Sequence, residues 1–284
     1  MTEAGKLPRT VGVLGGGRMG SGIAHAFACG GSTVLIAEAD EAAAASAGAS
    51  VEAAVRESAE RGTLGEAVES VLDRLSVGVG IAHLAGSALV VEAVPEDALL
   101  KASVLGEIER TVEPEAVVTN TSSLSIDELA VVLEHPERFC GMHFFNPVPA
   151  SQLVEIVVGS RTGDHLVALA RDWVTCLGKT PVVVRDSPGF ASSRLGVALG
   201  LEAIRMVEEG VGSPEDIDAA MTLGYKHPVG PLRLTDLVGL DVRLGIAEYL
   251  ASKLGERFEP PRLLREMVGR GELGRKSGKG FYEW

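Results

Sequence analysis

The chain has 284 residues, a formal net charge of −13 and a sequence pI near 5.0. This acidic balance argues against nucleic acid or an anionic membrane as a partner, because both bind basic surfaces. No uninterrupted run of 18 apolar residues is present to span a bilayer, and no apolar signal core follows Met1. Three scattered cysteines without a CxxC pair predict neither a metal site nor disulfides. We therefore expect a cytoplasmic globular protein without a metal.

The first forty residues predict a β-α-β unit. Residues 10–14 are a short β-branched run, residues 18–29 have a helical pattern, and residues 33–37 again resemble a strand. Residues 41–74, rich in Ala, Glu and Arg with two glycine breaks, predict two helices that can form a projecting hairpin.

Strands and helices continue to alternate up to residue 186. Helices are expected at residues 97–112 and 164–177. This alternation is typical of a parallel sheet covered by helices on both faces. The further strands are expected at residues 88–91, 116–119, 139–143, 153–158 and 181–184.

The pattern changes at the SPG turn, residues 187–189, after which nearly every segment is helical. We expect an α/β domain over residues 1–186 and an all-helical C-terminal domain over residues 187–284. The apolar helices of the second domain predict the interface of a homodimer. Its helices are expected at residues 194–209, 213–223, 231–254 and 262–270.

A glycine-rich turn follows the first strand. Gly15, Gly17 and Gly20 in GGGRMG satisfy G-x-G-x-x-G, with Arg18 and Met19 between the last two glycines. The pattern alone is weak in a chain with 35 glycines, but here it follows a strand and opens a helix. Such glycines allow a tight turn, close approach of backbone N–H groups to a pyrophosphate, and close helix packing. The sequence therefore predicts a Rossmann-type domain that binds NAD through these five residues.

Acidic residues follow the second and third expected strands. Glu38 lies 18 residues after Gly20, where a carboxylate accepts hydrogen bonds from the ribose hydroxyls and repels the 2′-phosphate of NADP. A solvated strand-end carboxylate is the alternative. In VVEAVPED, Glu92 or Glu96 is a candidate to face the cofactor, although Glu96 and Asp97 can instead simply begin a helix.

Hydroxyl and amide side chains cluster after the strand at residues 116–119. The segment TNTSS, residues 119–123, is followed by LSIDEL, in which Ser125 and Glu128 can form a capping box. The same polar side chains, Ser122 among them, are equally suited to hold a polar ligand.

The segment GMHFFNPVPASQLVEIV carries the strongest signal for catalysis. His143 ends an apolar strand, Asn146 follows two aromatic residues, and Glu155 lies inside the next apolar strand, twelve residues after His143. A carboxylate in such a strand is costly to bury unless it is paired. A histidine on the adjacent strand is its natural partner, and the pair would orient the imidazole and raise its basicity for acid–base chemistry.

At these residues the sequence resembles the L-3-hydroxyacyl-CoA dehydrogenase family, in particular its bacterial short-chain members. The resemblance covers nearly the whole chain and includes VLGGGRMGSGIAHAFA, VVEAVPED, TNTSSLSI, MHFFNPVP, LVEIV, LGKTPVVVRDSPGF, HPVGPLRLTDLVGLD and GRKSGKGFYEW. It implies NAD-dependent oxidation of a 3-hydroxyacyl-CoA, with 3-hydroxybutyryl-CoA the expected substrate, in fatty acid metabolism. The roles implied are base for His143, its orienting partner for Glu155, contacts to substrate and nicotinamide for Ser122 and Asn146, and positions around NAD for Glu38, Glu96 and Lys101.

The chain departs from the family pattern at one expected substrate contact. Where the family usually has Asn-Arg after SPGF, this chain has Ser193-Arg194, and serine is shorter and lacks the amide. Ser193 therefore leaves open a dehydrogenase of a free hydroxy acid or sugar acid on the same scaffold. A dinucleotide-binding protein without turnover is a third hypothesis, which the combination of Ser122, His143, Asn146 and Glu155 disfavours.

Two other polar residues have structural interpretations. Lys179 in LGKTP resembles the lysine of other hydroxyacid dehydrogenases, but its place just after a helix also suits a cation at the negative helix end. Asp236 in DLVGLD is expected to cap or pack elements of the helical domain.

Overall fold

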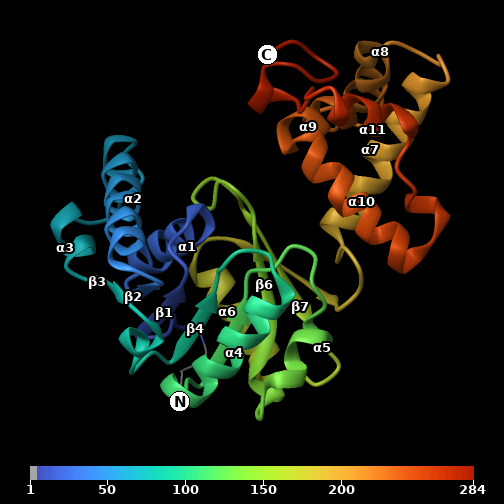
Figure 1. Ribbon diagram of the computed structural model, residues 1–284. Helices are drawn as coiled ribbons and strands as arrows, with labels where there is room; N and C mark the ends of the chain where they lie inside the picture. Colours follow the sequence, from blue (N-terminus) through green and yellow to red (C-terminus); the bar gives the residue numbers. More distant parts are fainter. Residues whose placement is uncertain (1–4) are drawn as a thin grey trace. The chain divides into compact units, whose positions relative to one another are not determined.

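The computed structural model describes residues 5–284, and the chain divides into two compact units, Met1–Asp186 and Ser187–Trp284 (Figure 1). The first unit is built on one sheet of eight strands among the described residues. Its strands are β1 (Thr10–Leu14), β2 (Thr33–Glu38), β3 (Leu75–Val79), β4 (Leu89–Glu92), β5 (Ala116–Thr119), β6 (Phe139–Phe144), β7 (Leu153–Val158) and β8 (Thr180–Arg185). Its α-helices are α1 (Arg18–Cys29), α2 (Glu41–Glu60), α3 (Val68–Leu72), α4 (Ala98–Val112), α5 (Ile126–Leu129) and α6 (Asp164–Cys176).

The strand order is β3-β2-β1-β4-β5-β6-β7-β8, so the chain moves outward from β1 in one direction and then returns to continue on its other side. This is the doubly wound order, and the carboxyl ends of β1 and β4 meet at the point where the direction reverses. The predicted Rossmann-type fold is confirmed. It places the glycine turn after β1 beside the VPED segment after β4.

The predicted parallel sheet is confirmed except at one pair of strands. β6 and β7 are antiparallel, while the other neighbouring strands are parallel. Only residues 145–152 join these two strands, and a parallel crossover needs a dozen residues or more. The antiparallel register places His143 directly opposite Glu155.

The segment at residues 41–74 forms two helices as predicted, α2 and the much shorter α3. The strand that follows them, β3, was not predicted. Its sequence LSVGV lies at the edge of the sheet and none of its residues is fully buried, so its apolar pattern is weak.

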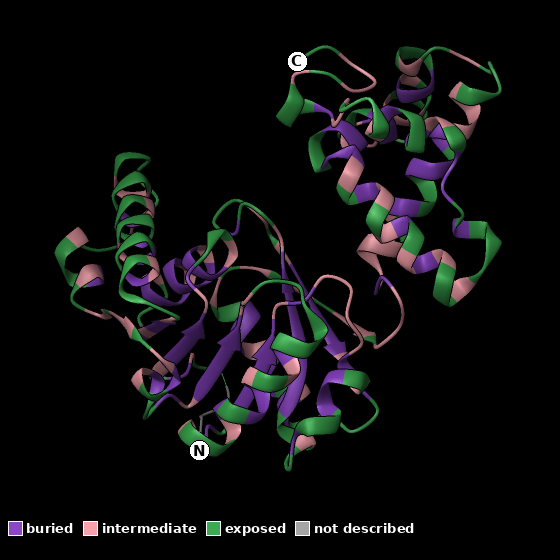
Figure 2. Ribbon diagram, viewed as in Figure 1, coloured by how far each residue is buried: buried purple, intermediate pink, exposed green. Residues whose placement is uncertain are grey.

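The strands in the middle of the sheet are the most buried part of the first unit (Figure 2). Every residue of β4, β5 and β6 is buried, because helices cover the sheet. Polar side chains within these strands are therefore held away from water. Such groups must find partners inside the protein, which limits where they can point.

The second unit is all-helical around its own apolar core. The helix predicted over residues 231–254 is instead two helices, because Gly239 has φ +104°, a conformation that ends α9 before α10 begins. Asp236 accepts hydrogen bonds from the backbone N–H groups of Phe281 and Tyr282 and from Trp284 Nε1, which fastens the C-terminal segment. The α-helices of the unit are α7 (Ser192–Glu208), α8 (Pro214–Ala219), α9 (Pro231–Val238), α10 (Leu240–Leu254) and α11 (Arg262–Gly269).

Candidate active site

The glycine turn lies at the switch point of the sheet. Gly15 has φ +91°, and a Cβ atom there would lie 2.9 Å from the carbonyl oxygen of Ala93, just beyond β4. A Cβ atom on Gly20 would clash with the carbonyl oxygen of Gly15. Both positions therefore require glycine, one for the backbone conformation and one for the close packing of α1 on the turn.

The N-terminus of α1 is open toward solvent. Gly17 is its N-cap and makes no side-chain cap hydrogen bond, and no atom lies within 4 Å of the place where its Cβ would stand. Gly17 and Arg18 are exposed, while Met19 packs partly against the core. The exposed end of a twelve-residue helix, with no side chain over it, fits the pyrophosphate of a dinucleotide.

Glu38 ends β2 and reaches the same turn. Its Oε1 accepts a hydrogen bond from the backbone N–H of Gly16 at 2.5 Å, and the residue is half-buried. The carboxylate is thus held beside the glycine turn, where the ribose of a bound dinucleotide would meet it.

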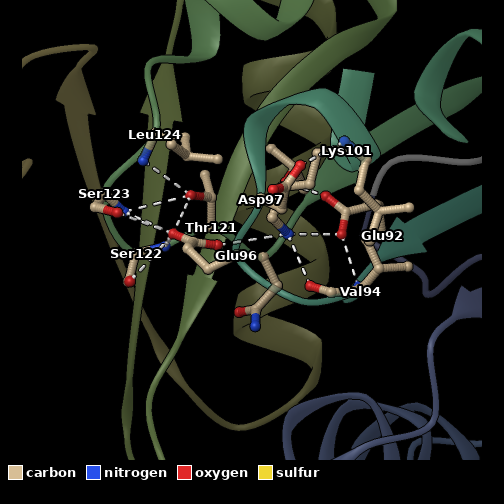
Figure 3. A network of polar contacts seen from close by, with 12 residues as sticks. Glu92, Val94, Glu96, Asp97, Lys101, Thr121, Ser122, Ser123 and Leu124 are labelled. Atoms are coloured by element: carbon tan, nitrogen blue, oxygen red, sulfur yellow. Dashed lines mark hydrogen bonds and ion pairs between the residues drawn. The ribbon is translucent and has the colours of Figure 1, made fainter. Parts of the chain in front are cut away.

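Glu92 and Lys101 form a buried ion pair behind the turn (Figure 3). Both side chains are fully buried, with Lys101 Nζ 2.7 Å from Glu92 Oε1. Glu92 also accepts hydrogen bonds from the Thr119 hydroxyl at 2.5 Å and the Val94 N–H at 2.7 Å. Of the two acidic residues considered for VVEAVPED, Glu92 therefore faces inward rather than toward a ligand. Lys101 also points inward, where its ammonium donates to the carbonyl of Val94.

Glu96 joins this ion pair to the TNTSS segment (Figure 3). Its Oε1 accepts hydrogen bonds from the hydroxyl of Thr121 at 2.6 Å and from the N–H groups of Ser122 and Ser123 at 2.9 and 3.2 Å. Its Oε2 lies 3.6 Å from Lys101 Nζ. Burial alone would raise the pKa of Glu96, but these hydrogen bonds and the Lys101 charge outweigh it and lower the pKa. Glu96 thereby fixes the backbone around Ser122 rather than merely beginning α4.

His143 and Glu155 contact each other across the antiparallel pair β6–β7. His143 Nδ1 lies 2.9 Å from Glu155 Oε2, and the two residues are 7% and 1% exposed. The Phe145 ring packs against the imidazole with 4.3 Å between the ring centroids. A buried carboxylate on one ring nitrogen fixes the orientation and the tautomer of the imidazole. This arrangement can take up and return a proton.

The segment between β6 and β7 is fastened on both sides. Asn120 Oδ1 accepts the N–H of Phe144, and Lys179 Nζ donates to the carbonyl oxygens of Val148 and Ser151, each at 2.6 Å. Lys179 therefore holds this segment in place, in keeping with its structural interpretation. Asn146 is exposed on the same segment.

Ser193 belongs to the second unit. It lies in the first turn of α7 and is half-buried. The other residues assigned by sequence to the cofactor and to catalysis lie in the first unit. Within it, His143 near the end of β6 and the turns after β1, β4 and β5 lie at the same carboxyl edge of the sheet.

Sequence reasoning missed two kinds of residue. The ion pair of Glu92 with Lys101 was not predicted. An acidic residue at the end of an apolar strand and a lysine in the first turns of the next helix could have indicated it. Arg243 was also missed. It lies with Leu240, Ala247 and Leu250 on the buried, otherwise apolar face of α10. A cation at this helical spacing among apolar residues could have been recognised in the sequence.

A glycine-rich turn between a strand and a helix, a carboxylate beside that turn and a buried histidine–carboxylate pair on one sheet are typical of an NAD-dependent oxidoreductase. The family model described as "3-hydroxyacyl-CoA dehydrogenase, NAD binding domain" matches residues 10–187, and "3-hydroxyacyl-CoA dehydrogenase, C-terminal domain" matches residues 189–284. The chain belongs to the 3-hydroxyacyl-CoA dehydrogenase family, whose members use NAD.

Three relatives illustrate the similarity. A probable 3-hydroxybutyryl-CoA dehydrogenase of Deinococcus radiodurans is 41% identical over 275 residues, covering 96% of this chain and 99% of the relative. The crystal structure of (S)-3-hydroxybutyryl-CoA dehydrogenase from Ralstonia eutropha superposes with a TM-score of 0.93 at 40% identity, covering 98% of this chain and 99% of that one. A 3-hydroxyadipyl-CoA dehydrogenase of Escherichia coli is 38% identical over 280 residues, covering 97% of this chain and 59% of the relative.

Residues 5–284 contain neither a membrane-spanning helix nor a metal-binding cluster. No helix among them is long and apolar enough to cross a membrane. In the same range, no group of three or more His, Cys, Asp or Glu side chains is arranged to hold a metal ion.

Proposed function

We propose that the protein oxidises 3-hydroxybutyryl-CoA to the 3-oxo thioester, with His143 as the general base and Glu155 as its orienting partner. The contact of Nδ1 with the buried Glu155 carboxylate is the observation that carries this proposal. It fixes the tautomer in which Nε2 accepts the proton of the substrate's 3-hydroxyl group. In the reverse direction, the imidazolium returns that proton to the 3-oxo oxygen.

The cofactor site is proposed on the glycine turn. Gly15, Gly17 and Gly20, with Arg18 and Met19 between the last two, would hold the pyrophosphate at the start of α1. Glu38 would bind the ribose, and Glu96 and Lys101 would support the neighbouring loop. When bound there, NAD would accept the hydride that leaves C3 of the substrate.

Ser122 and Asn146 are proposed to position the reacting groups. Glu96 accepts hydrogen bonds from the backbone N–H and from the hydroxyl of Ser122, at 2.9 and 3.3 Å. These contacts keep the Ser122 hydroxyl at the carboxyl end of β5, where its oxygen can accept a hydrogen bond from the substrate's 3-hydroxyl group. Asn146 is exposed on the fastened segment after β6, where its amide can contact substrate and nicotinamide. Ser193 is proposed as a substrate contact from the helical unit, with a shorter reach than the family's asparagine.

The CoA thioester is preferred to a free hydroxy acid because both family models and the relatives are 3-hydroxyacyl-CoA dehydrogenases. We place the reaction in fatty acid metabolism in the cytoplasm. We also propose a homodimer formed through the helical unit, supported by exposed apolar side chains on α7, α9 and α10. They are Leu195, Leu199, Leu237, Val238 and Val242.

Steady-state rates with NAD test the proposal. Wild type is expected to oxidise 3-hydroxybutyryl-CoA and to be nearly inactive on free 3-hydroxybutyrate. His143→Gln should lower kcat by about 10²–10⁴-fold, since it removes the base. His165→Gln, the same change at an exposed histidine of α6, is the matched control and should leave the rate unchanged. Turnover of the free acid alone, or full activity of His143→Gln, would refute the proposal.

A further inference from the structure

Lys179 lies at the same edge of the sheet as His143. It comes between α6 and β8, where its backbone N–H donates to the carbonyl of Val174 at 3.0 Å. The register pairs Thr180, the first residue of β8, with Leu153 at the start of β7, and β7 runs antiparallel to β6. The start of β8 and the carboxyl end of β6 therefore lie at one edge of the sheet, in the same unit.

The ammonium of Lys179 has backbone carbonyls as its acceptors. Its Nζ donates to the carbonyl oxygens of Val148 and Ser151, each at 2.6 Å, and no carboxylate among residues 5–284 forms an ion pair with it. Burial lowers the pKa of Lys179, and no counter-charge opposes that effect. A cation that is partly removed from water without a counter-charge is costly, so the two carbonyls account for its position.

The two carbonyls belong to a compact turn, residues 147–151, which directly follows Asn146. The backbone N–H groups of Ala150 and Ser151 both donate to the carbonyl of Pro147, at 3.1 and 3.0 Å. The turn is thus closed by its own hydrogen bonds and joined to the start of β8 by the lysine ammonium. Asn146 therefore precedes a segment whose position is fixed from outside as well as from within.

The same turn packs on the helix that begins at the proposed pyrophosphate site. Val148 is 2% exposed, and a Cβ atom on Gly22 of α1 would lie 2.9 Å from the Cβ of Val148. Gly22 lies about one helical turn after Arg18, the first residue of α1. This packing, together with the hydrogen bonds of Lys179, sets the distance between Asn146 and the start of α1. A dinucleotide bound at that start has to extend over this distance to bring its nicotinamide to Asn146.

We propose that Lys179 is a positioning residue for the dehydrogenase reaction, which holds the turn of residues 147–151 so that the Asn146 amide meets the nicotinamide and the substrate. The proposal rests on the function proposed above, through the role given there to Asn146. The ammonium is directed to the carbonyls of the turn, so Lys179 acts through Asn146. A misplacement of about 1 Å in such a group can cost about 10²-fold in rate. Binding of the adenosine half of NAD, by contrast, should not depend on Lys179.

The test separates the two halves of the cofactor. ADP-ribose has the adenosine and pyrophosphate of NAD but no nicotinamide, so its binding reports on the glycine turn and Glu38. In Lys179→Met, kcat/KM for 3-hydroxybutyryl-CoA with NAD should fall by about 10–100-fold. The Kd of ADP-ribose, measured by calorimetry, should stay unchanged. Lys179→Arg should keep more of the rate, because a guanidinium can also donate to both carbonyls. Lys6→Met, the same change at an exposed lysine of the same unit, is the matched control and should change neither quantity.

A double-mutant cycle shows whether Lys179 acts through Asn146. Asn146→Ala removes the amide, so adding Lys179→Met to it should lower kcat/KM by less than about threefold further. A lysine that acted on the site independently of Asn146 would cause the full loss in both backgrounds. Val148→Ala loosens the packing of the turn on α1 without removing a charge, and it should give the same pattern in weaker form. Thermal melting shows which variants are folded, and Val148→Ala carries the test if Lys179→Met is not.

The outcomes separate this inference from the proposed function. If wild type oxidises 3-hydroxybutyryl-CoA and folded Lys179→Met does so equally well, only this inference fails. It is also overturned if Lys179→Met weakens ADP-ribose binding as much as it lowers the rate, or if its loss is the same in the wild-type and Asn146→Ala backgrounds. If wild type oxidises no CoA thioester, the proposed function fails, and the inference with it.

Discussion

Lys101 and Arg243 are both buried cations, one in each unit, and their surroundings are opposite. The ammonium of Lys101 is fully buried, yet it contacts Glu92, Glu96 and the carbonyl of Val94. Arg243 is 4% exposed, its Nε is fully buried and unpaired, and no acceptor for its guanidinium is found among residues 5–284. The Lys101 ammonium therefore has hydrogen-bond and ion-pair partners, whereas the N–H groups of the Arg243 guanidinium lack acceptors.

The presence or absence of a partner decides how each cation affects the stability of its unit. A satisfied buried pair fixes the positions of the groups around it, here the ends of β4 and β5 and the loop that carries Ser122. A buried cation without an acceptor destabilises its own unit, because nothing compensates the loss of its hydration. Replacing each with an apolar side chain should therefore have opposite effects on stability.

The largest effect is expected for Lys101→Met. It leaves the Glu92 carboxylate buried without its cation, which should lower the free energy of unfolding of the first unit by about 3–5 kcal/mol. The chain has two tryptophans, Trp173 in the first unit and Trp284 in the second. Urea unfolding followed by fluorescence in a Trp284→Phe background therefore reports on the first unit alone.

The control for this change is the double variant Glu92→Gln, Lys101→Met. It removes both charges, so it should recover part of the lost stability. An unchanged unfolding midpoint for Lys101→Met would show that the ion pair does not stabilise the unit.

The opposite sign is expected for Arg243→Met. Removing an unpaired buried charge should raise the stability of the second unit by about 1–4 kcal/mol. The measurement is urea unfolding in a Trp173→Phe background, where Trp284 is the only tryptophan. Arg275→Met, at an exposed arginine of the same unit, is the control. A lower stability of Arg243→Met would mean that the guanidinium already has an acceptor.

A smaller loss is expected for Asp236→Asn, which disturbs a satisfied buried anion of the helical unit. The carboxylate accepts three N–H groups from the C-terminal segment, and an amide cannot accept all three without bringing its own NH₂ group against a donor. We expect a cost of about 1–3 kcal/mol. Hydrogen exchange of the amides of Phe281 and Tyr282 should speed up. Glu283→Gln, exposed in the same segment, should leave their exchange unchanged.

The smallest effect concerns acid pH. The pKa of Glu96 is lowered in the folded protein, so its contribution to stability is present above its usual pKa near 4.3 and is lost as the pH falls through the folded value. Melting temperatures between pH 7 and pH 3 should therefore fall less steeply below about pH 4.3 in Glu96→Gln than in wild type. Parallel curves would show that Glu96 titrates alike in both states.

Much of the fold was predictable because it depends on short-range patterns. The first β-α-β unit, the strands up to residue 185 except β3, and the change to helices at residue 187 follow from periodicity and turn residues. β3 was missed because it is a half-buried edge strand. The antiparallel β6–β7 pair could have been predicted, because the connection between the two expected strands is too short for a parallel crossover. The single helix expected over residues 231–254 failed at Gly239, whose φ of +104° is set by its surroundings.

The site divides in the same way. The glycine turn, Glu38 and the pairing of His143 with Glu155 could be inferred from sequence, because each combines a residue type with a defined place on a strand. The burial of Lys101 and the isolation of Arg243 could not, because both depend on which distant side chains surround them. Lys101 and Glu92 meet only when α4 packs against the sheet, and Arg243 fits only where Gly196 and Gly200 leave space.

The sequence by itself determined the order of elements, the glycine turn and the pairing of His143 with Glu155, since local conformational preference and hydrophobic periodicity depend on neighbouring residues. Only the tertiary structure decided which charges are satisfied. Solvation and the distance to a counter-charge depend on packing. Two cations that each lie among apolar residues in the sequence can therefore be buried with a partner or without one.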